Sequence, residues 1–472
     1  MGNATTASVT GVQVAPAKSA IRDLPIAKVW AFAVGQFGWA LLSGIISNWL
    51  VYFYQPDQET ISQGQTVFVP QGLVVLGIVT VVGGITAFAR FFDAFVDPAV
   101  ASLSDRCDAK SGRRMPFLKF AALPLAVVTV LVFWSPINGT SWVNAAFLFV
   151  TVIGYYIALT FYCTPYNALI AELGHDSKQQ LTISTAISFT WVAGTAIAYV
   201  APVIWGAFVP MMGRITAIRV TFTIMAAVAF VCMLVPPLAI REKDYVNSHP
   251  TSESTIESLK QTFGDGEFRK FVCSDVVYWV AITTFQTGLP FFVTSLLKLP
   301  ETTTTIYFVL MTGVSVLFYL PVNILANKVG KKRLLLVAFV IFTCAFAFAG
   351  ALGSAGLGFI PAMAQGLVLS VVGAIPMAAF GILPQAIVAN IADASSKTTG
   401  QDRQGMFYAA RTFAMKMGQS VAMLLFTGVS TIGMASGAGY RIAAVCAAVL
   451  CGLGGIVFAF YNEKKVLGVL ET

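Results

Sequence analysis

The chain has 472 residues, of which 57% are hydrophobic and only 11% are charged. An ordinary soluble domain carries roughly 25% charged residues, so this composition excludes a soluble enzyme of this length. The net charge of +8 would suit a nucleic-acid partner, but the distribution of the basic residues, described below, excludes that class as well.

Apolar stretches of about 20 residues recur along the chain, which is the pattern of membrane-spanning helices. We therefore predict an all-α integral membrane protein with twelve transmembrane helices. Their approximate cores are 28–54, 72–101, 117–135, 144–171, 181–209, 217–240, 269–297, 304–326, 334–355, 359–391, 406–430 and 439–461.

The start of the chain, MGNATTASVTGVQVAPAKSA, is small and polar and lacks the apolar core of a signal peptide. We expect residues 1–27 to form a disordered tail on the cytoplasmic side. The first residues also match the N-myristoylation pattern, although a chain with many spans gains little from one acyl group.

The distribution of Lys and Arg predicts the orientation. With the N-terminus placed in the cytoplasm, 22 of the 29 basic residues fall on that side, 4 fall on the opposite side, and 3 lie within spans. This asymmetry follows the positive-inside rule. We therefore expect a multi-pass protein of the cell membrane with both termini in the cytoplasm.

The longest polar connection, 241–268, separates two six-helix halves at 28–240 and 269–461, and residues 462–472 form a second cytoplasmic tail. A weak repeat supports this division. SDRCDAKSGRRMP after the second span matches ANKVGKKRLLL after the eighth, and PYNALIAELG after the fourth matches PQAIVANIAD after the tenth. Two halves repeating at a six-span offset are typical of major-facilitator transporters, which bind substrate between the halves near the midplane.

The segments RFFDAFVDP, SDRCDAKSGRRMP, TPYNALIAEL and ARTFAMKMGQS together resemble the glycoside–pentoside–hexuronide:cation symporter family, whose best-known member is melibiose permease. The resemblance covers essentially all twelve spans. It implies the major-facilitator fold and cation-coupled transport of a small solute.

Two carboxylates, Asp93 and Asp97, lie one helical turn apart in the second span, so they share a face, and Arg90 precedes them by one turn. A charged residue at the centre of a span costs about 2.5–3.5 kcal/mol, so the pair requires compensation. Either Na⁺ or a proton would supply it. Alternatively, Arg90 neutralises one carboxylate and the cluster only holds helices together.

The resemblance implies that Asp93, Asp97 and Thr160 form the cation site, with Asp93 and Asp97 as the metal ligands if Na⁺ is used. Sodium-using relatives carry an amide side chain just before the second aspartate, where this chain has Val96. This difference favours H⁺ over Na⁺. We expect no cofactor besides the coupling ion.

Lys416 lies about ten residues inside the eleventh span, too deep to reach the membrane surface easily. We expect it to pair with the two aspartates or with substrate, and the alternative is an ion pair that ties the halves together. Arg411 is either a gate residue or an interfacial one. We also predict a gating network of charged residues: Arg90, Arg106, Arg113, Arg114, Glu172, Asp393 and Arg411.

Polar and aromatic side chains on spans that line the expected cavity are candidate substrate ligands alongside Lys416: Thr412, Gln36, Trp39, Asn167 and Trp191. The sugar-binding acids and arginine of melibiose-type relatives are absent, since their positions hold Ala40, Cys163 and Ile187. The resemblance therefore identifies the coupling site better than it identifies the substrate.

We expect a monomeric secondary active transporter that couples H⁺ or Na⁺ to uptake of a sugar or sugar acid by alternating access. Its partners are a small-molecule substrate and the lipid bilayer, without nucleic acid. Two alternatives remain: a cation-coupled lysolipid carrier of the same fold, and a sensor that no longer transports. We find no catalytic motif and expect no enzyme activity.

Overall fold

The computed structural model describes residues 23–77, 79–107, 109, 112–174, 177–246, 261–399, 404–433 and 436–471. Most of the predicted N-terminal tail, and the middle of the predicted central loop, lie outside the described residues.

Within this part of the chain, twelve helices have 18 residues or more, which confirms the all-α prediction. They are α1 (Ile26–Tyr54), α3 (Val81–Asp105), α4 (Met115–Val132), α5 (Trp142–Leu173), α6 (Ser177–Met212), α7 (Arg214–Ala239), α9 (Gly266–Phe291), α10 (Thr302–Val329), α11 (Lys331–Ala351), α12 (Ala362–Thr399), α13 (Gln404–Val429) and α14 (Ala438–Ala459). Short helical segments accompany them: α2 (Gln58–Ser62), η1 (Glu242–Asp244), η2 (Phe292–Leu296), η3 (Ala355–Leu357) and α15 (Glu463–Glu471).

The second span begins later than the sequence predicts, at Val81 rather than at residue 72. The apolar run before it contains Gly72 and Gly77, both with positive φ, a conformation that interrupts a helix and that glycine adopts readily. The Thr80 side chain then caps α3 by accepting a hydrogen bond from the backbone N–H of Gly83 at 3.0 Å. Hydrophobicity alone therefore misplaces this boundary.

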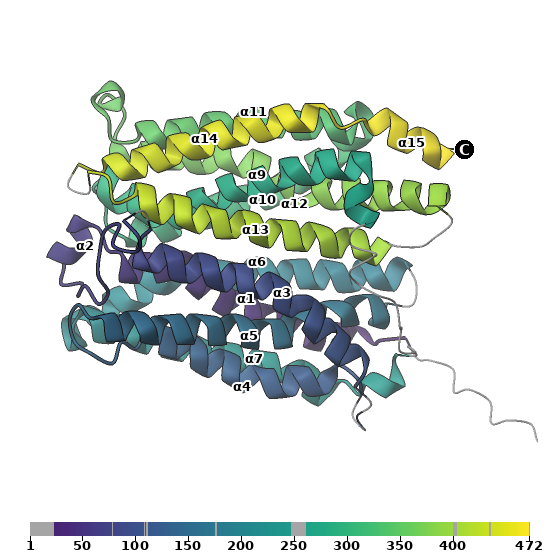
Figure 1. The fold of residues 1–472 in the computed structure, drawn as a ribbon, viewed down its shortest axis with the longest axis horizontal. Helices are drawn as coiled ribbons and strands as arrows, with labels where there is room; N and C mark the ends of the chain where they lie inside the picture. Colours follow the sequence, from purple (N-terminus) through teal and green to yellow (C-terminus); the bar gives the residue numbers. More distant parts are fainter. Residues whose placement is uncertain are drawn as a thin grey trace, which may run out of the picture.

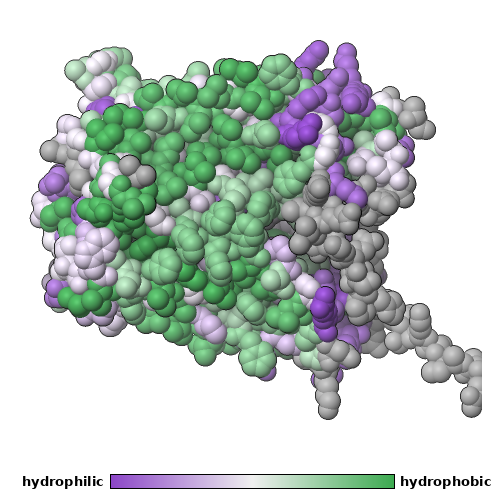
Figure 2. All heavy atoms as spheres, in the orientation of Figure 1, coloured by the Kyte–Doolittle hydropathy of each residue, from purple (hydrophilic) through white to green (hydrophobic). Residues whose placement is uncertain are grey.

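Apolar residues cover the middle of the face seen in Figure 2, as expected for contact with lipid. Ten of the twelve long helices are long and apolar enough to cross a membrane. The other two, α3 and α13, are the helices that carry Asp93, Asp97 and Lys416. The charged side chains of α3 and α13 therefore make these two helices less apolar than the other ten.

The helices pack as two groups that meet along a few contacts (Figure 1). Helices α1 and α4 to α7 pack chiefly on one another, and α9 to α12 and α14 do the same, whereas α3 and α13 each pack extensively on both groups. Between the groups, α3 packs on α13, α6 on α10, and α1 on α9. The second and eleventh spans, α3 and α13, correspond in the six-span repeat to the eighth and fifth spans, α10 and α6. Both pairs pack across the groups, so these contacts have the symmetry that the sequence repeat predicts.

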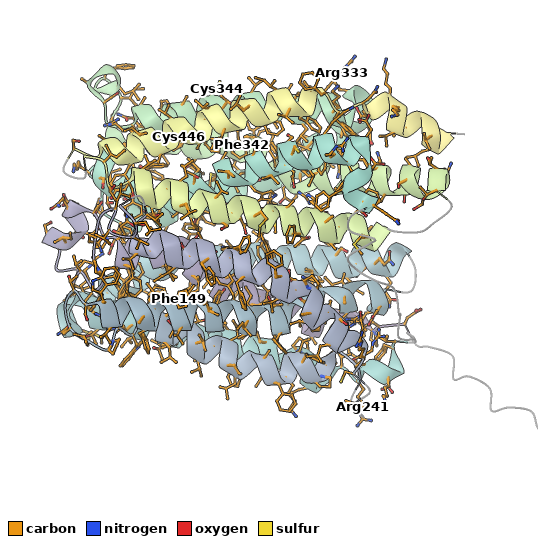
Figure 3. All side chains as sticks on the ribbon, viewed as in Figure 1. Phe149, Arg241, Arg333, Phe342, Cys344 and Cys446 are labelled. Carbon is orange, nitrogen blue, oxygen red and sulfur yellow. The ribbon has the colours of Figure 1, made fainter. Side chains whose placement is uncertain are left out.

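The two ends of the bundle differ in charge. The terminal end, where α1 begins and α14 ends, lies on the right in Figure 1, and the far end lies on the left. Arg241 and Arg333 lie at the terminal end, one in each group of helices (Figure 3). The far end has Arg214 and Arg219 at the start of α7. The predicted asymmetry of basic residues thus maps onto opposite ends of the helices.

Candidate functional site

A charge cluster joins the two helical groups where α3 packs on α13. The Nζ atom of Lys416 lies 2.7 Å from Oδ2 of Asp93 and 2.6 Å from Oδ2 of Asp97. The Asp93 side chain is 2% exposed, while that of Asp97 is 24% exposed. One lysine therefore faces two carboxylates, and when both are ionised the three side chains together carry one negative charge.

Two hydroxyl groups contact the oxygen atoms that face away from Lys416. Thr160 on α5 donates to Oδ1 of Asp93 at 2.5 Å and lies 3.2 Å from Oδ1 of Asp97. Thr164, one turn further along α5, lies 3.2 Å from the same Asp97 oxygen. The predicted trio Asp93, Asp97 and Thr160 is thus brought together, with Thr164 as an addition. These oxygens form a polar group suited to a proton or a hard cation.

Arg90 does not pair with the carboxylates, contrary to the alternative in which it neutralises one of them. Its guanidinium donates to Gln419 at 2.7 Å and to Ser47 at 3.2 Å, and it lies 5.2 Å from the centre of the Tyr156 ring. The two carboxylates pair instead with Lys416, which approaches them from α13. Arg90 instead links α1, α3 and α13 through neutral partners.

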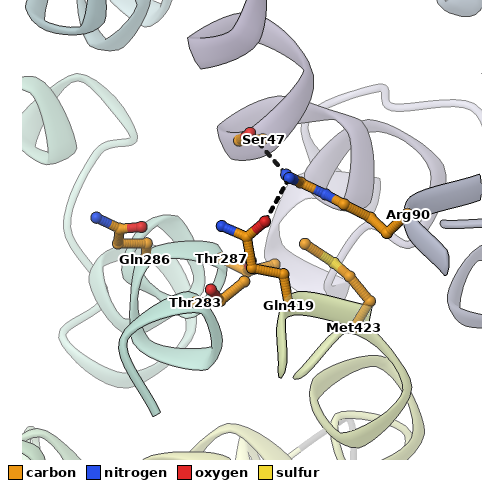
Figure 4. Close-up of a pocket in the computed structure, with 7 residues that line it drawn as sticks. All are labelled: Ser47, Arg90, Thr283, Gln286, Thr287, Gln419 and Met423. Atoms are coloured by element: carbon orange, nitrogen blue, oxygen red, sulfur yellow. Dashed lines mark hydrogen bonds between the residues drawn. The ribbon is translucent and has the colours of Figure 1, made fainter. Parts of the chain in front are cut away.

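A small polar cavity of ≈ 40 Å³ lies beside Arg90 (Figure 4). It is lined by residues from α1, α3, α9 and α13: Ser47, Arg90, Thr283, Gln286, Thr287, Gln419 and Met423. On both α3 and α13 these lining residues come about one turn nearer the far end than the charge cluster does. The cavity therefore lies between the charge cluster and the far end, at the meeting line of the two groups.

Arg411 forms a buried ion pair with Asp275 of α9. Its Nε and a terminal nitrogen lie 2.8 and 3.1 Å from the two carboxylate oxygens. Both side chains are at most 10% exposed. Because both residues belong to the second helical group, this pair does not bridge the two groups. It acts here as a bidentate link between α13 and α9.

At the far end, Glu301 is the centre of a second network that crosses between the groups. Glu301 precedes α10 and pairs with Arg214 at 2.6 Å. It also accepts hydrogen bonds from Trp205 at 2.5 Å and Tyr52 at 3.0 Å. The Arg214 and Glu301 side chains are 6% and 10% exposed. This buried network holds α1, α6 and α7 to the start of α10.

Further cross-group contacts lie at the same end. Asp57, which caps α2, accepts hydrogen bonds from Thr294 and Ser295 of η2. Gln55 donates to the backbone oxygen of Thr427 and to the Ser430 hydroxyl, both at 2.9 Å. Together with the Glu301 network, these contacts close the far end across the meeting line.

At the terminal end, the ion pairs in which both partners are described residues stay within one group. Glu172 pairs with Arg113 and Arg114, each at 2.7 Å, and Arg114 also pairs with Asp105 at 2.8 Å. The predicted pairing of Glu172 with these arginines is therefore present, but it does not join the halves. Arg106 is exposed and makes none of these ion pairs, and Asp393 lies in α12.

The other predicted substrate ligands are scattered. Gln36 is buried, and its side-chain oxygen has no hydrogen-bond partner. The Trp39 and Trp191 rings contact each other at 5.0 Å between centroids. Asn167 is exposed. Thr412 is also exposed, and its hydroxyl bonds back to the Tyr408 carbonyl at 3.0 Å.

Sequence reasoning missed several residues that the structure places in buried ion pairs or beside the cavity. Asp275 carried a usable signal, because a lone carboxylate in an apolar span predicts a partner such as Arg411. In the sequence, Glu301 and Arg214 are charged residues near the ends of spans, where charges normally face water. Thr283 and Gln419 read as ordinary polar residues in helices, so no sequence signal marks them.

A model of the family described as "MFS/sugar transport protein" matches residues 31–461. The chain belongs to this family. The match spans nearly all the described helices, which confirms the resemblance drawn from the motifs around Asp93 and Lys416. The proteins of this family are membrane transporters rather than enzymes.

Curated relatives are similar over parts of the chain. The uncharacterized symporter YjmB of Bacillus subtilis is 23% identical over 74% of this chain and 75% of its own length. The inner membrane symporter YicJ of Escherichia coli is 25% identical over 47% of each chain. The isoprimeverose transporter of Lactiplantibacillus pentosus is 24% identical over 37% of this chain and 33% of its own length. Apart from YjmB, this chain thus spans half or less of these relatives.

Solved structures share the fold at low sequence identity. The nucleoside transporter NupG aligns with a TM-score of 0.62 and 14% identity over 93% of this chain and 99% of its own. A bacterial homologue of the lysosomal transporter Spinster, solved in an inward-facing and unoccupied conformation, aligns with a TM-score of 0.63 and 12% identity over 94% of this chain and 97% of its own. These likenesses support the twelve-helix transporter fold.

Proposed function

We propose that this protein is a secondary active symporter that couples entry of a cation to uptake of a sugar or sugar acid. The observation that carries the proposal is the cluster of Asp93, Asp97 and Lys416, which crosses from one helical group to the other. A carrier of this kind must couple ion binding to movement of its halves. A cation that binds the carboxylates changes the very contact that holds α3 to α13.

The cluster keeps one negative charge, which one monovalent cation neutralises. Thr160 and Thr164 add hydroxyl oxygens on the side away from Lys416. Val96 supplies no further oxygen. We therefore take the proton as the coupling ion, since a proton needs only one carboxylate oxygen whereas a metal ion needs several ligands. One charge crossing 100 mV gains about 2.3 kcal/mol, enough to concentrate a solute tens-fold.

The names of relatives support a sugar as the substrate class, because they include an isoprimeverose transporter and a putative glycoside/cation symporter, YagG of Escherichia coli. The cavity beside Arg90 is lined mostly by polar side chains, which suits a hydroxyl-rich solute better than an acyl chain. With the termini in the cytoplasm, as the basic residues indicate, the contacts at the far end close the extracellular side.

The test is uptake into proteoliposomes under an imposed proton or Na⁺ gradient. The panel contains D-xylose, D-glucose, methyl β-D-glucoside and D-glucuronate, each with and without lysophosphatidylcholine as a competitor. We expect accumulation of at least one sugar that a proton ionophore abolishes. If only a Na⁺ gradient drives uptake, Na⁺ rather than the proton is the coupling ion. Uptake of labelled lysophosphatidylcholine without uptake of any sugar would overturn the substrate class.

A further inference from the structure

The polar groups of the cavity are concentrated on α9, in the second helical group. Thr283, Gln286 and Thr287 line it, and they recur at spacings of three and four residues, which places them on one helix face. Thr283 and Gln419 of α13 both line this cavity (Figure 4).

Thr283 is one of five threonines in the described helices whose buried hydroxyl has no hydrogen-bond partner, and of these five it is the one that lines the cavity. Thr283 is only 6% exposed, and its hydroxyl has no hydrogen-bond partner. Many helical threonines satisfy their hydroxyl by bonding to the carbonyl four residues earlier, as Thr129 does with Leu125 at 2.7 Å. Leaving a buried hydroxyl unpaired is unfavourable. The unpaired hydroxyl of Thr283 lines the cavity and is therefore available to a ligand.

Other groups around α9 are also available. The indole N–H of Trp279, one turn before Thr283, is buried and has no partner, and neither has Nε of Arg90. None of the residues that line the cavity is acidic. The lining therefore offers hydroxyl and amide groups that both donate and accept, together with one cationic donor. This set matches a carbon chain bearing several hydroxyl groups.

We propose that the α9 face formed by Trp279, Thr283, Gln286 and Thr287 binds the hydroxyl groups of the substrate and determines which sugar is carried. This inference rests on the proposed function and assigns substrate selection to the second helical group. The cavity holds about three water molecules at its present size. A monosaccharide is larger, so it contacts α9 after the walls on α3 and α13 move apart.

The test is equilibrium binding of the same four sugars to the purified full-length protein, followed by tryptophan fluorescence, without any ion gradient. Thr283→Val removes the hydroxyl at nearly constant size, and Thr283→Ser restores it. Thr129→Val is the matched control, because it removes a fully buried threonine hydroxyl on α4 that lies away from the cavity. We expect Thr283→Val to weaken sugar binding about 3- to 10-fold, while Thr283→Ser and Thr129→Val bind like the unaltered protein.

Deoxy analogues of the sugar that binds provide a second readout, which a merely structural role would not change. One analogue should lose affinity for the unaltered protein but bind equally to it and to Thr283→Val. If Thr283→Val and Gln286→Leu both bind every sugar normally, the assignment to α9 is wrong while the proposed symport stands. If the unaltered protein binds none of the four sugars, both the substrate class and this inference fail.

Discussion

Lys416 approaches Asp97 to 2.6 Å across the line where the two helical groups meet. The same ammonium group lies 2.7 Å from Asp93. A buried ion pair of this kind stabilises little in itself, yet breaking it by removal of one partner is costly. The contact is therefore suited to a device that opens only when another positive charge takes over the carboxylates.

Replacing Asp97 with Asn should abolish gradient-driven accumulation. The change removes one carboxylate and leaves a neutral cluster with Lys416, which has no remaining negative charge for the coupling cation. We expect the accumulation ratio to fall from tens-fold to about 1, while downhill exchange of labelled sugar continues. The measurement is uptake and counterflow in proteoliposomes. Uphill uptake by a protein that carries both Asp93→Asn and Asp97→Asn would refute the coupling role.

Replacing Lys416 with Met should destabilise the protein. Two carboxylates would then face each other in a buried site without compensation, at a cost of about 3–5 kcal/mol. A second change, Asp97→Asn, should restore much of the loss, because the net charge of the cluster returns to its original value. Thermal unfolding in detergent measures both effects.

Lys465→Met is the matched control for Lys416→Met, since the Lys465 side chain is 69% exposed and its pairing with Glu267 spans 3.8 Å. A surface pair of this kind contributes about 0–1 kcal/mol. Equal melting temperatures for Lys416→Met and Lys465→Met would show that the charge cluster does not stabilise this state.

Replacing Glu301 with Gln should open the far end. The change breaks the ion pair with Arg214 and leaves a buried guanidinium without its carboxylate, which costs about 3–5 kcal/mol. Spin labels at Ser62 and Ala355, on opposite sides of the meeting line, should report longer distances by double electron–electron resonance. Arg219→Gln is the control, because Arg219 bonds to Phe133 within its own group. Unchanged distances in Glu301→Gln would exclude a closing role for the network.

Replacing Glu172 with Gln should lower thermal stability without altering the distance between the far-end labels. Glu172 links Arg113 and Arg114 at the terminal end, with side chains 8–15% exposed. Its loss should cost about 3–5 kcal/mol. Lys270→Gln is the control, since the Lys270 side chain is 43% exposed and its pair should contribute less than about 1 kcal/mol. A change in the label distance would instead indicate that Glu172 joins the two groups.

The twelve helices could be predicted because long apolar runs are needed to span a membrane. The charge cluster could be predicted because a charged residue is rare and costly within such a run. Asp93, Asp97 and Lys416 stand out among apolar neighbours, and burial in a span demands partners for them. The boundary of the second span was predicted wrongly, because Gly72 and Gly77 interrupt an apolar run that otherwise reads as helix.

The cross-group contacts could not be predicted in the same way. Arg214 and Glu301 stand 87 residues apart, at the ends of spans where charges normally face water, so only the packing of the two helical groups brings them together. The proposed role of Thr283 depends on its hydroxyl having no hydrogen-bond partner. Neither the composition of the sequence nor its hydrophobic periodicity reveals this. Arg90 pairs with an aspartate only in the alternative interpretation of the sequence, and the structure instead extends its side chain toward Gln419 on another helix.

The small size of the cavity beside Arg90 has a consequence for hydration. Opening it to admit a sugar also admits many water molecules, whose number grows with the volume gained. Solutes too large to enter, such as high-molecular-weight polyethylene glycols, draw water out of the protein and should favour the compact form. We therefore expect osmotic pressure to weaken sugar binding to this carrier, because it favours the form in which the cavity is too small for the sugar.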